Sequence, residues 1–315
     1  MSNYEEKAIR VAFGEALLEL GAEFQDLVVL DADISSSLNT YHFAQLYPER
    51  HINFGVAEQN MLISAAGLAT TGLIPLACTY ATFATMRACE QIRSFFCYGN
   101  LNVKIAASHG GIEVGWDGAT HQAMEDVAIT RAMPNMRVVV PADAVAAQAL
   151  IRQAITSSGP LYFRMGRNPV PIIYDQHQSF TLGKAIQIRE GSHLTLIAMG
   201  IMVSIALEVA ERLAKRGIQA AVLDMHTVKP IDRDALLMAA AKTPLLVTLE
   251  DHSIIGGLGS AIAETVSEEQ PRKIIRIGIP DTFAESGDPK TLFHSFGMDV
   301  ASIEDKIIRA IQTKP

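Results

Sequence analysis

Short runs of apolar residues alternate with helical patterns along most of the chain. The apolar residues of Tyr4–Leu20 recur at helical spacing, which predicts a helix that ends at Gly21. Buried strands are predicted at 27–30, 74–80, 103–108, 138–140, 161–163, 194–198, 220–223, 245–249 and 273–277. Strands that alternate with helices are typical of parallel sheets covered by helices on both faces. The pattern therefore predicts an α/β fold made of doubly wound, mostly parallel sheets.

The alternation breaks in one region near the middle of the chain. Asn168–Pro171 contains two prolines, and the polar segment Asp175–Ser179 follows it. Stretches of this composition are typical of domain boundaries. We therefore predict two domains, residues 1–175 and 184–315, joined by a linker at 176–183, and each is long enough to bury its own core.

The stretch from Asn53 to Met61 places a glycine, and then Glu58, at the start of a helix. Acidic residues are common in a first turn because the helix dipole favours negative charge there, so a structural role also explains Glu58. Residues 61–77 carry no charge, which predicts a helix buried nearly all round. A carboxylate that leads into a buried helix needs a partner. A bound cofactor is the partner that we favour.

Polar side chains follow two of the predicted strands. Residues 31–37 contain carboxylates and hydroxyls, and the glycine-rich loop 109–121 contains two histidines and an aspartate. Ligands bind at the carboxyl edge of open parallel sheets, although an ordinary polar loop explains 31–37 equally well. The histidines and the aspartate do not complete a metal-ligand set, so we predict no metal site within this chain.

Composition narrows the classes of partner. The net charge of −8 and the lack of a basic run argue against binding to nucleic acid or to an anionic membrane. The three cysteines, Cys78, Cys89 and Cys97, suggest neither a disulfide framework nor a zinc site. No run has the length and composition of a membrane span, and the N-terminus does not resemble a secretory signal. We expect a cytoplasmic enzyme.

Six motifs then point to a family. They are GVAEQNM at 55–61, YATF at 80–83, SHGG at 108–111, DGATHQ at 117–122, VKPID at 228–232 and EDH at 250–252. Together they resemble transketolase, and the resemblance covers essentially the whole chain. It corresponds to the pyrimidine-binding and C-terminal domains of that family. The Gly-Asp-Gly motif with which the family binds the diphosphate and its metal does not occur in this sequence. The resemblance therefore implies one subunit of a split transketolase.

The resemblance also implies a cofactor and a partner. The cofactor is thiamin diphosphate with Mg²⁺ (or Ca²⁺ or Mn²⁺), held mainly by a separate N-terminal subunit in an α2β2 assembly. Glu58 hydrogen-bonds the aminopyrimidine ring and activates the cofactor as its own base. The residues expected around the cofactor are Glu58, Tyr80, Phe83, Met86 and Asp33. Met86 stands where the family commonly has an aromatic residue, although a methionine can also contact a ring.

The same resemblance assigns the substrate side. His109 and His121, the expected catalytic residues besides Glu58, contact the sugar's hydroxyls and carbonyl oxygen, and Asp117 binds the donor hydroxyl beside that carbonyl. A phosphate or another tetrahedral anion at the far end of the sugar is assigned to Arg10, Ser37, His109 and Arg164. Arginines make charge-assisted, bidentate contacts to such anions, although either arginine taken singly is also explained as a surface residue.

The expected reaction is transfer of a two-carbon ketol unit from a ketose, such as a sugar phosphate, to an aldose. Three alternatives stay open: the β subunit of a 2-oxoacid dehydrogenase, an enzyme similar to deoxyxylulose-phosphate synthase, and a non-catalytic assembly module. The combination of Asp117 with two histidines favours the sugar reaction. Glu250–His252 is interpreted as a structural or interface group.

Overall fold

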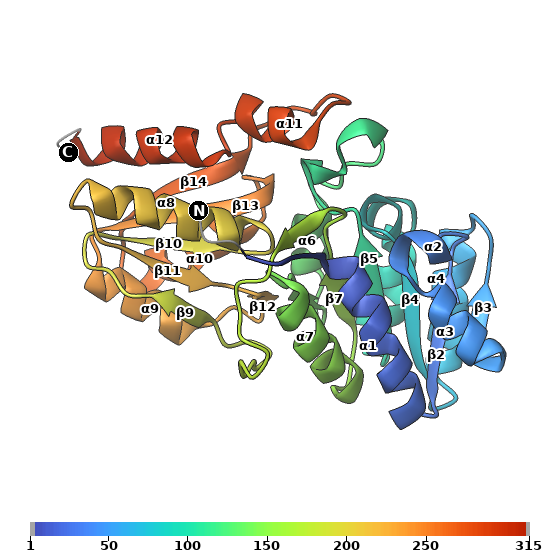
Figure 1. Cartoon of the computed structure of the whole chain (residues 1–315). Helices are drawn as coiled ribbons and strands as arrows, with labels where there is room; N and C mark the ends of the chain where they lie inside the picture. Colours follow the sequence, from blue (N-terminus) through green and yellow to red (C-terminus); the bar gives the residue numbers. More distant parts are fainter. Residues whose placement is uncertain (1–3, 313–315) are drawn as a thin grey trace.

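The structure, a computed structural model, describes residues 4–312, so the outermost residues of the two predicted domains lie outside it. Two parts lie side by side, and each is built around its own sheet (Figure 1). This arrangement confirms the predicted α/β class with two mostly parallel sheets. No helix within the described residues is long and apolar enough to cross a membrane.

The first sheet has seven strands in the order β12-β6-β7-β5-β4-β2-β3, and only the edge pair β12–β6 is antiparallel. Its strands are β2 (Leu27–Asp31), β3 (His51–Asn53), β4 (Ile74–Tyr80), β5 (Lys104–Ser108), β6 (Arg137–Val139), β7 (Leu161–Arg164) and β12 (Thr227–Lys229). The α-helices of this part are α1 (Ile9–Glu23), α2 (Ser35–Leu38), α3 (Tyr41–Leu46), α4 (Glu58–Ala69), α5 (Cys89–Gln91), α6 (Asp126–Ala132) and α7 (Ala144–Thr156). Shorter turns are the 3-10 helices η1 (Pro48–Arg50) and η4 (Ile112–Asp117) and the π-helices η2 (Phe83–Arg87) and η3 (Ile92–Cys97).

The second sheet has five strands in the order β14-β13-β10-β11-β9, with β9 antiparallel at its edge. The strands are β9 (Ile186–Arg189), β10 (Leu194–Ala198), β11 (Ala220–Asp224), β13 (Leu245–Ser253) and β14 (Lys273–Ile279). The helices are α8 (Met202–Lys215), α9 (Arg233–Lys242), α10 (Leu258–Glu269), α11 (Pro289–Ser295) and α12 (Val300–Gln312). A separate two-stranded sheet pairs β1 (Glu6–Ala8) with β8 (Pro169–Pro171).

One strand crosses from the second part to the first. The sequence predicts that all of 184–315 belongs to the C-terminal domain, yet β12 adds to the edge of the first sheet. Thr227 pairs with Val139, and Lys229 with Val138. Val228, between them, is buried in a core cluster that contains residues of both parts. The boundary is therefore not a single point in the sequence, because this apolar segment finds its backbone partners in the other part.

The start of the chain also differs from the prediction. Residues 6–8 form β1, and α1 starts only at Ile9. The helix then continues past Gly21 to Glu23. A Cβ at Gly21 would lie 2.4 Å from the ring of Tyr47. This glycine therefore serves close packing against that ring rather than ending the helix.

Helix α4 is less buried than its uncharged sequence predicts. Its side toward the sheet is buried, but Gln59, Asn60, Ile63 and Gly67 are exposed. A helix on one face of a sheet is covered on one side only, so within this single chain the opposite side of α4 has no cover.

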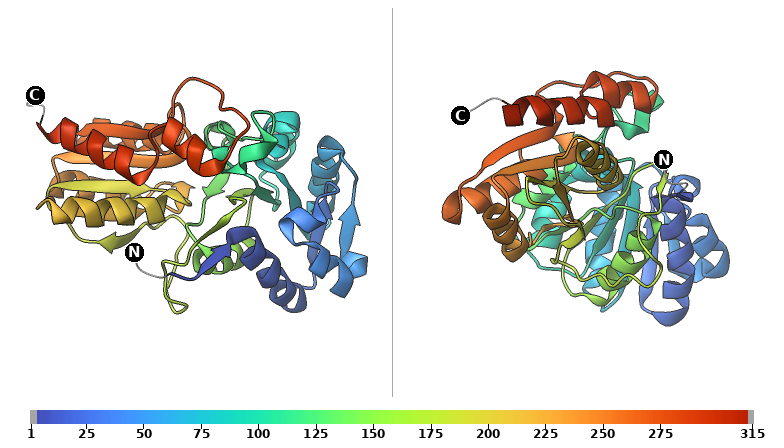
Figure 2. Two further views of the ribbon diagram at one scale, coloured as in Figure 1. Left: turned by 45° about the horizontal axis from the view of Figure 1, so that its top comes forward. Right: turned by 60° about the vertical axis from the view of Figure 1, so that its left-hand side comes forward.

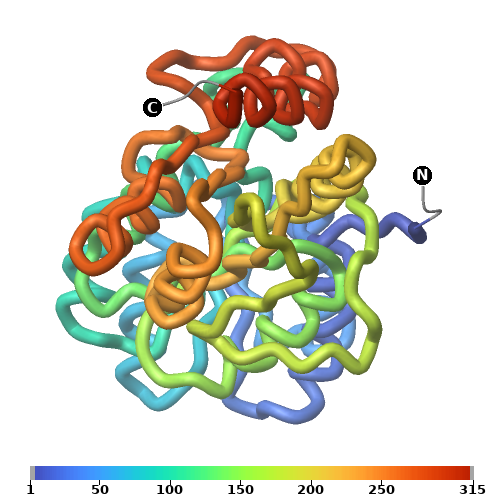
Figure 3. Tube along the Cα trace, turned by 90° about the vertical axis from the view of Figure 1, so that its left-hand side faces the viewer, coloured from blue at the N-terminus to red at the C-terminus, as the bar shows by residue number. Residues whose placement is uncertain are grey.

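Four neighbouring strands open their carboxyl ends at one edge of the first sheet. Asp31 is level with Asn53 on one side and with Cys78 on the other, and Tyr80 is level with Ser108. The loops that carry the motifs therefore meet at this edge. Figure 2 shows from two further directions that the loop after β5 lies beside α11. In Figure 3 the last helices, in red, lie next to the green segment of the same loop.

Candidate active site

A turn after β3 brings Glu58 to the carboxyl edge of the first sheet. Gly55 has a φ of 68°, which glycine adopts without strain, and α4 begins at Glu58. Asn53 Oδ1 accepts hydrogen bonds from the backbone N–H groups of Gly55 at 2.9 Å and Asp33 at 3.0 Å. Asn53 Nδ2 donates to Asp33 Oδ1 at 3.1 Å. Asp33 therefore lies beside the turn that leads into Glu58.

Glu58 is a buried carboxylate with one cationic partner. Only 2% of Glu58 is exposed, and Arg87 Nη1 donates to its Oε2 at 2.7 Å. Among the described residues, none donates a hydrogen bond to Oε1. The guanidinium carbon of Arg87 lies 4.3 Å from the centroid of the Phe83 ring, a cation–π contact. One carboxylate oxygen is therefore held, and the other is left to accept a hydrogen bond from a ligand.

Aromatic rings and imidazoles form a wall beside this carboxylate. The ring centroids of Tyr80 and His109 are 4.1 Å apart, and those of Phe83 and His121 are 5.2 Å apart. Tyr80 ends β4 and His109 follows β5, so the pairing of these strands brings the two rings together. Met86, on the same turn as Phe83, is 43% exposed. The wall thus consists of Tyr80 and Phe83 from one loop and two histidines from the next.

His109 is held neutral in a cationic neighbourhood. It is 3% exposed, has a φ of 61°, and its Nδ1 lies 2.8 Å from Ser108 Oγ. Burial lowers the pKa of His109 to about 3, and the positive charges of Arg167 and Arg10 and the imidazole of His121 act in the same direction. The imidazole is therefore uncharged at neutral pH, with Nε2 left for a ligand.

The predicted anion residues Arg10 and Ser37 meet at the same edge. Arg10 Nη1 donates to the carbonyl oxygen of Ser37 at 2.7 Å, and Arg10 Nε donates to that of Arg167 at 2.9 Å. Ser37 Oγ lies 2.9 Å from the Tyr80 hydroxyl. Residues far apart in sequence are thus joined by direct hydrogen bonds, and the group borders the ring wall through Tyr80.

Arg164, however, does not belong to this group. Its side chain is 6% exposed, and its Nε donates to Asp126 Oδ2 at 2.7 Å. Its Nη2 donates to the carbonyl oxygens of Ala123 at 3.1 Å and Asp251 at 2.8 Å. This placement speaks against the predicted anion-binding role of Arg164, because its charge is paired with Asp126 and its Nε and Nη2 donors are used inside the protein.

Arg167 lies beside Arg10, which donates to its carbonyl oxygen. Its side chain is 35% exposed, and its Nη1 donates to the carbonyl oxygen of Val114 at 2.9 Å and lies 3.4 Å from Asp117 Oδ1. Asp117 is also partly exposed, so this pair borders solvent. Arg167 and Arg10 are the two arginines whose charges act on His109. Together they form the cationic end of the candidate site.

The motifs do not point to Arg87 or Arg167. Arg87 follows Phe83 by four positions, and that helical spacing is the signal that could have found it. Arg167 lies three residues after Arg164 at the end of a strand, and nothing in the sequence favours one over the other. Only the ion pair with Asp126 separates them.

The geometry fits the pyrimidine half of thiamin diphosphate. Glu58 Oε1 provides an unpartnered acceptor, and Tyr80 and Phe83 are half-buried rings beside it. Within residues 4–312, no three His, Cys, Asp or Glu side chains are grouped so that they could hold a metal ion. The acceptor and the two rings therefore suit the aminopyrimidine ring of the cofactor.

Comparisons with known proteins give the two parts of the chain their family descriptions. The description "Transketolase, pyrimidine binding domain" matches residues 5–172, and "Transketolase, C-terminal domain" matches residues 183–303. A 6-deoxy-6-sulfo-D-fructose transketolase subunit of a Clostridium species is 43% identical over 299 residues, with 95% of this chain and 93% of that protein covered. One of the subunits of an apulose-4-phosphate transketolase from Phocaeicola vulgatus is 37% identical over 297 residues, covering 94% of this chain and 95% of that one.

Solved structures are similar as well. One titled "Split gene transketolase, inactive beta4 tetramer" superposes with a TM-score of 0.90 at 45% identity, covering 99% of this chain and all of that chain. The chain also matches 1-deoxy-D-xylulose-5-phosphate synthase of Caldanaerobacter subterraneus at 36% identity, but it spans only 48% of that protein. The domain matches and the full-length relatives together show that this chain belongs to the transketolase family, as a protein of the split-subunit type.

Proposed function

We propose that the chain is the C-terminal subunit of a thiamin-diphosphate-dependent transketolase. It transfers a two-carbon ketol unit from a ketose to an aldose together with a separate N-terminal subunit, in an α2β2 assembly. The observation that carries this proposal is the meeting of Glu58, Phe83 and His109 at one edge of the first sheet. A carboxylate acceptor, an aromatic surface and a neutral imidazole are the groups that this reaction requires.

In the proposed site, bound thiamin diphosphate supplies the nucleophilic carbon that takes up the ketol unit. Glu58 Oε1 hydrogen-bonds the aminopyrimidine ring, while Arg87 holds Oε2. Tyr80 and Phe83 pack against that ring, and Asp33 lies at its border. The diphosphate and its Mg²⁺ (or Ca²⁺ or Mn²⁺) are assigned mainly to the partner subunit, whose side chains complete the site.

The two histidines and the arginines act on the sugar. His109 is neutral, so its Nε2 can donate or accept a hydrogen bond at the sugar's oxygens, depending on the tautomer. His121 lies on the same wall, and Asp117 accepts a hydrogen bond from the hydroxyl beside the carbonyl. Arg10 and Arg167 bind the anion at the far end of the substrate, with Ser37 as a further polar contact.

The anion at the far end of the substrate defines the class of sugar that the enzyme uses. The relatives include one whose name specifies a sulfonated sugar and one whose name specifies a sugar phosphate. Both anions are tetrahedral and both suit a pair of arginines. We therefore propose an anionic ketose as the donor, with sugar phosphates and sulfonated sugars as the two classes to compare.

The test uses the purified chain with thiamin diphosphate and Mg²⁺, alone and with a candidate N-terminal subunit that carries a Gly-Asp-Gly motif. Ketol transfer from ketose phosphates and ketose sulfonates is measured for the wild type and for Glu58→Ala. Glu208→Ala, a substitution of a half-exposed glutamate on α8, is the matched control. We expect transfer only with both chains, loss of transfer in Glu58→Ala, and no change in the control.

Other outcomes would assign other functions. Decarboxylation of a 2-oxo acid without transfer from any ketose would indicate a dehydrogenase β subunit. Formation of 1-deoxy-D-xylulose 5-phosphate would indicate a synthase like the relative from Caldanaerobacter subterraneus, of which this chain spans 48%. A stable two-chain complex that binds no cofactor would favour an assembly module.

A further inference from the structure

The loop that carries His109, Asp117 and His121 is held from outside by the second part of the chain. Asp251 in β13 is 3% exposed, and its Oδ1 accepts a hydrogen bond from the backbone N–H of Ile112 at 2.9 Å. Its Oδ2 is 3.4 Å from the N–H of Glu113. One buried carboxylate from the C-terminal domain thus holds two successive N–H groups of this loop.

The close approach requires a glycine. Gly111 has a φ of 83°, and a Cβ added there would lie 2.0 Å from Asp251 Oδ2. No side chain can occupy that space while the carboxylate remains in place. The second glycine of the SHGG motif is therefore explained by a contact between the two parts of the chain.

A second set of contacts holds the far end of the loop. Ser286 Oγ donates to the carbonyl oxygen of Trp116 at 2.6 Å, and Gln122 Nε2 donates to that of Glu285 at 3.0 Å. Figures 1 and 2 show the same segment of the loop beside α11. The loop is thus attached to the C-terminal domain on both sides of η4.

Glu113 extends this attachment to the cationic end of the site. Its Oε1 accepts hydrogen bonds from the backbone N–H groups of Arg167 and of Asn168. Asn168 Nδ2 in turn donates to the carbonyl oxygen of Glu113 at 2.8 Å. The loop and the segment that carries Arg167 are therefore joined through one buried carboxyl.

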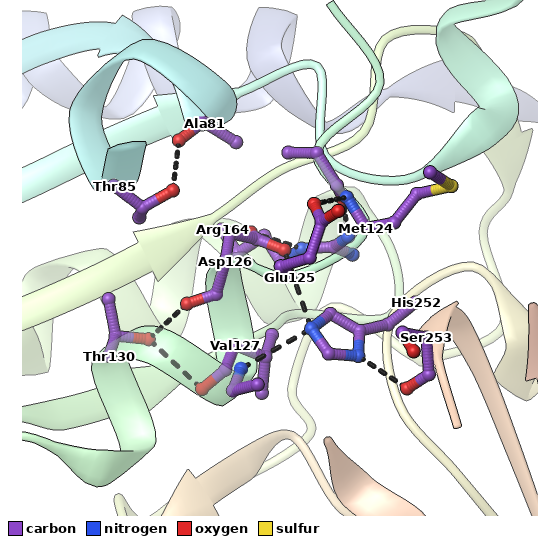
Figure 4. Close-up of polar contacts among 12 residues, drawn as sticks. Ala81, Thr85, Met124, Glu125, Asp126, Val127, Thr130, Arg164, His252 and Ser253 are labelled. Carbon is purple, nitrogen blue, oxygen red and sulfur yellow. Dashed lines mark hydrogen bonds and ion pairs between the residues drawn. The ribbon is translucent and has the colours of Figure 1, made fainter. Parts of the chain in front are cut away.

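The neighbours of Asp251 have different partners. Glu250 accepts hydrogen bonds from the N–H groups of Leu258 and Gly259, at the start of α10 within its own domain. His252 Nε2 accepts one from the N–H of Ala128 at 3.3 Å. Figure 4 shows His252 beside α6, below the buried pair of Asp126 and Arg164. Of the three residues of the EDH motif, only Asp251 has side-chain hydrogen bonds to the loop 109–121.

We propose that Asp251 and Glu113 are positioning residues through which the C-terminal domain sets the place of His109, Asp117 and Arg167. The substrate side of this inference rests on the proposed function, whereas the attachment of the loop does not. The C-terminal domain then has a role in catalysis without contributing a residue that touches the substrate.

The loop carries the single tryptophan of the chain, so its attachment can be measured directly. Trp116 is 67% exposed, and its fluorescence anisotropy and its quenching by acrylamide report the mobility of the loop. Asp251→Asn keeps the shape of the side chain but turns one of the two acceptors into a donor that faces an N–H group. We expect lower anisotropy and stronger quenching in this variant. Glu250→Gln, in the same strand and equally buried, is the matched control and should leave both unchanged.

A second, milder variant separates the loss of a loop contact from misfolding. Ser286→Ala removes the exposed hydroxyl that binds the Trp116 carbonyl, and it leaves the buried core unchanged. It should also lower the anisotropy of Trp116. The proposal that these residues hold the loop would be wrong if both variants folded and their Trp116 signals matched those of the wild type.

The effect on catalysis is measured with the two-chain complex. In Asp251→Asn we expect the KM for the anionic ketose to rise about tenfold or more, by analogy with metal sites, where loss of a residue that orients a ligand costs about 10–100-fold in affinity or activity. The Kd of thiamin diphosphate should change much less, because Glu58 is held by Arg87 and not by this loop. If the KM for the ketose and the Kd of thiamin diphosphate rose by the same factor, Asp251 would not act specifically on substrate binding. A complex that transfers no ketol unit would refute the proposed function, while the Trp116 measurement would still decide whether Asp251 holds the loop.

Discussion

Arg87 Nη1 donates a hydrogen bond to Glu58 Oε2 at 2.7 Å, while its guanidinium lies on the ring of Phe83. The carboxylate is 2% exposed and the arginine side chain 44% exposed, so a surface cation stabilises a buried charge. The same contact also fixes the direction in which the second carboxylate oxygen is presented.

Removing this cation should weaken both the fold and the catalytic step. For Arg87→Met we expect the free energy of unfolding to fall by about 1–2 kcal/mol, because a buried carboxylate loses its charged donor at a partly exposed site. The kcat of ketol transfer should fall as well, and Arg87→Lys should recover part of both losses. Urea unfolding and steady-state kinetics measure these effects. Arg93→Met, at an exposed position nearby, is the control, and an Arg87→Met protein as active as this control would contradict the prediction.

The two candidate arginines, Arg167 and Arg164, should give opposite results on substitution. Arg167→Met should raise the KM for anionic ketoses with little loss of stability, because this side chain is partly exposed beside Asp117. Arg164→Met should lower the free energy of unfolding by about 3–5 kcal/mol, because it leaves the buried carboxylate of Asp126 unpaired. Kinetics and chemical unfolding of both variants provide the measurement. A stable Arg164→Met protein with a selective loss of sugar binding would show instead that Arg164 binds the anion, as the sequence predicts.

His109 should stay neutral well below the pH at which a free histidine titrates. Burial lowers its pKa from 6.5 to about 3. We expect the NMR signal of its imidazole C2 proton to stay nearly constant from about pH 8 to about pH 5, while exposed histidines titrate in that range. His109→Asn identifies the signal by its disappearance. A midpoint near 6.5 would show that the imidazole is solvated and that its neutral role in the proposed site is wrong.

Glu113 should make stability depend on pH. Burial, followed by the charge of Asp251, raises its pKa from 4.5 to about 7. Between these values the native state binds more protons than the unfolded state, so the stabilisation is complete below about pH 4.5 and is lost as the pH rises through about 7. The shift corresponds to about 3 kcal/mol. Urea unfolding of the wild type and Glu113→Gln across this range should give a smaller decline for the variant, and parallel curves would exclude this titration.

The local patterns were sufficient for much of the fold. Alternating apolar runs predicted nine strands of the two mostly parallel sheets, because each buried strand is a short continuous apolar segment. The same patterns missed the edge strands β3, β9 and β12 and the small pair β1 and β8, and they placed the start of α1 too early. Val228 looks like any other apolar residue of the second domain, and its burial against the first sheet depends on contacts between segments far apart in sequence.

The chemistry of the candidate site divides in the same way. Glu58, Tyr80, Phe83 and the two histidines could be named as candidates because each lies in a short motif. The parallel strands that precede these motifs bring them to one edge of the sheet. The choice between Arg164 and Arg167 was not recognisable, because both follow the same strand and differ only in which of them finds Asp126. Local sequence sets the periodicity of burial and the residue types at strand ends. Which charges are paired, and which stay open to a ligand, is determined by long-range packing, here by a carboxylate 38 residues away and by the C-terminal domain.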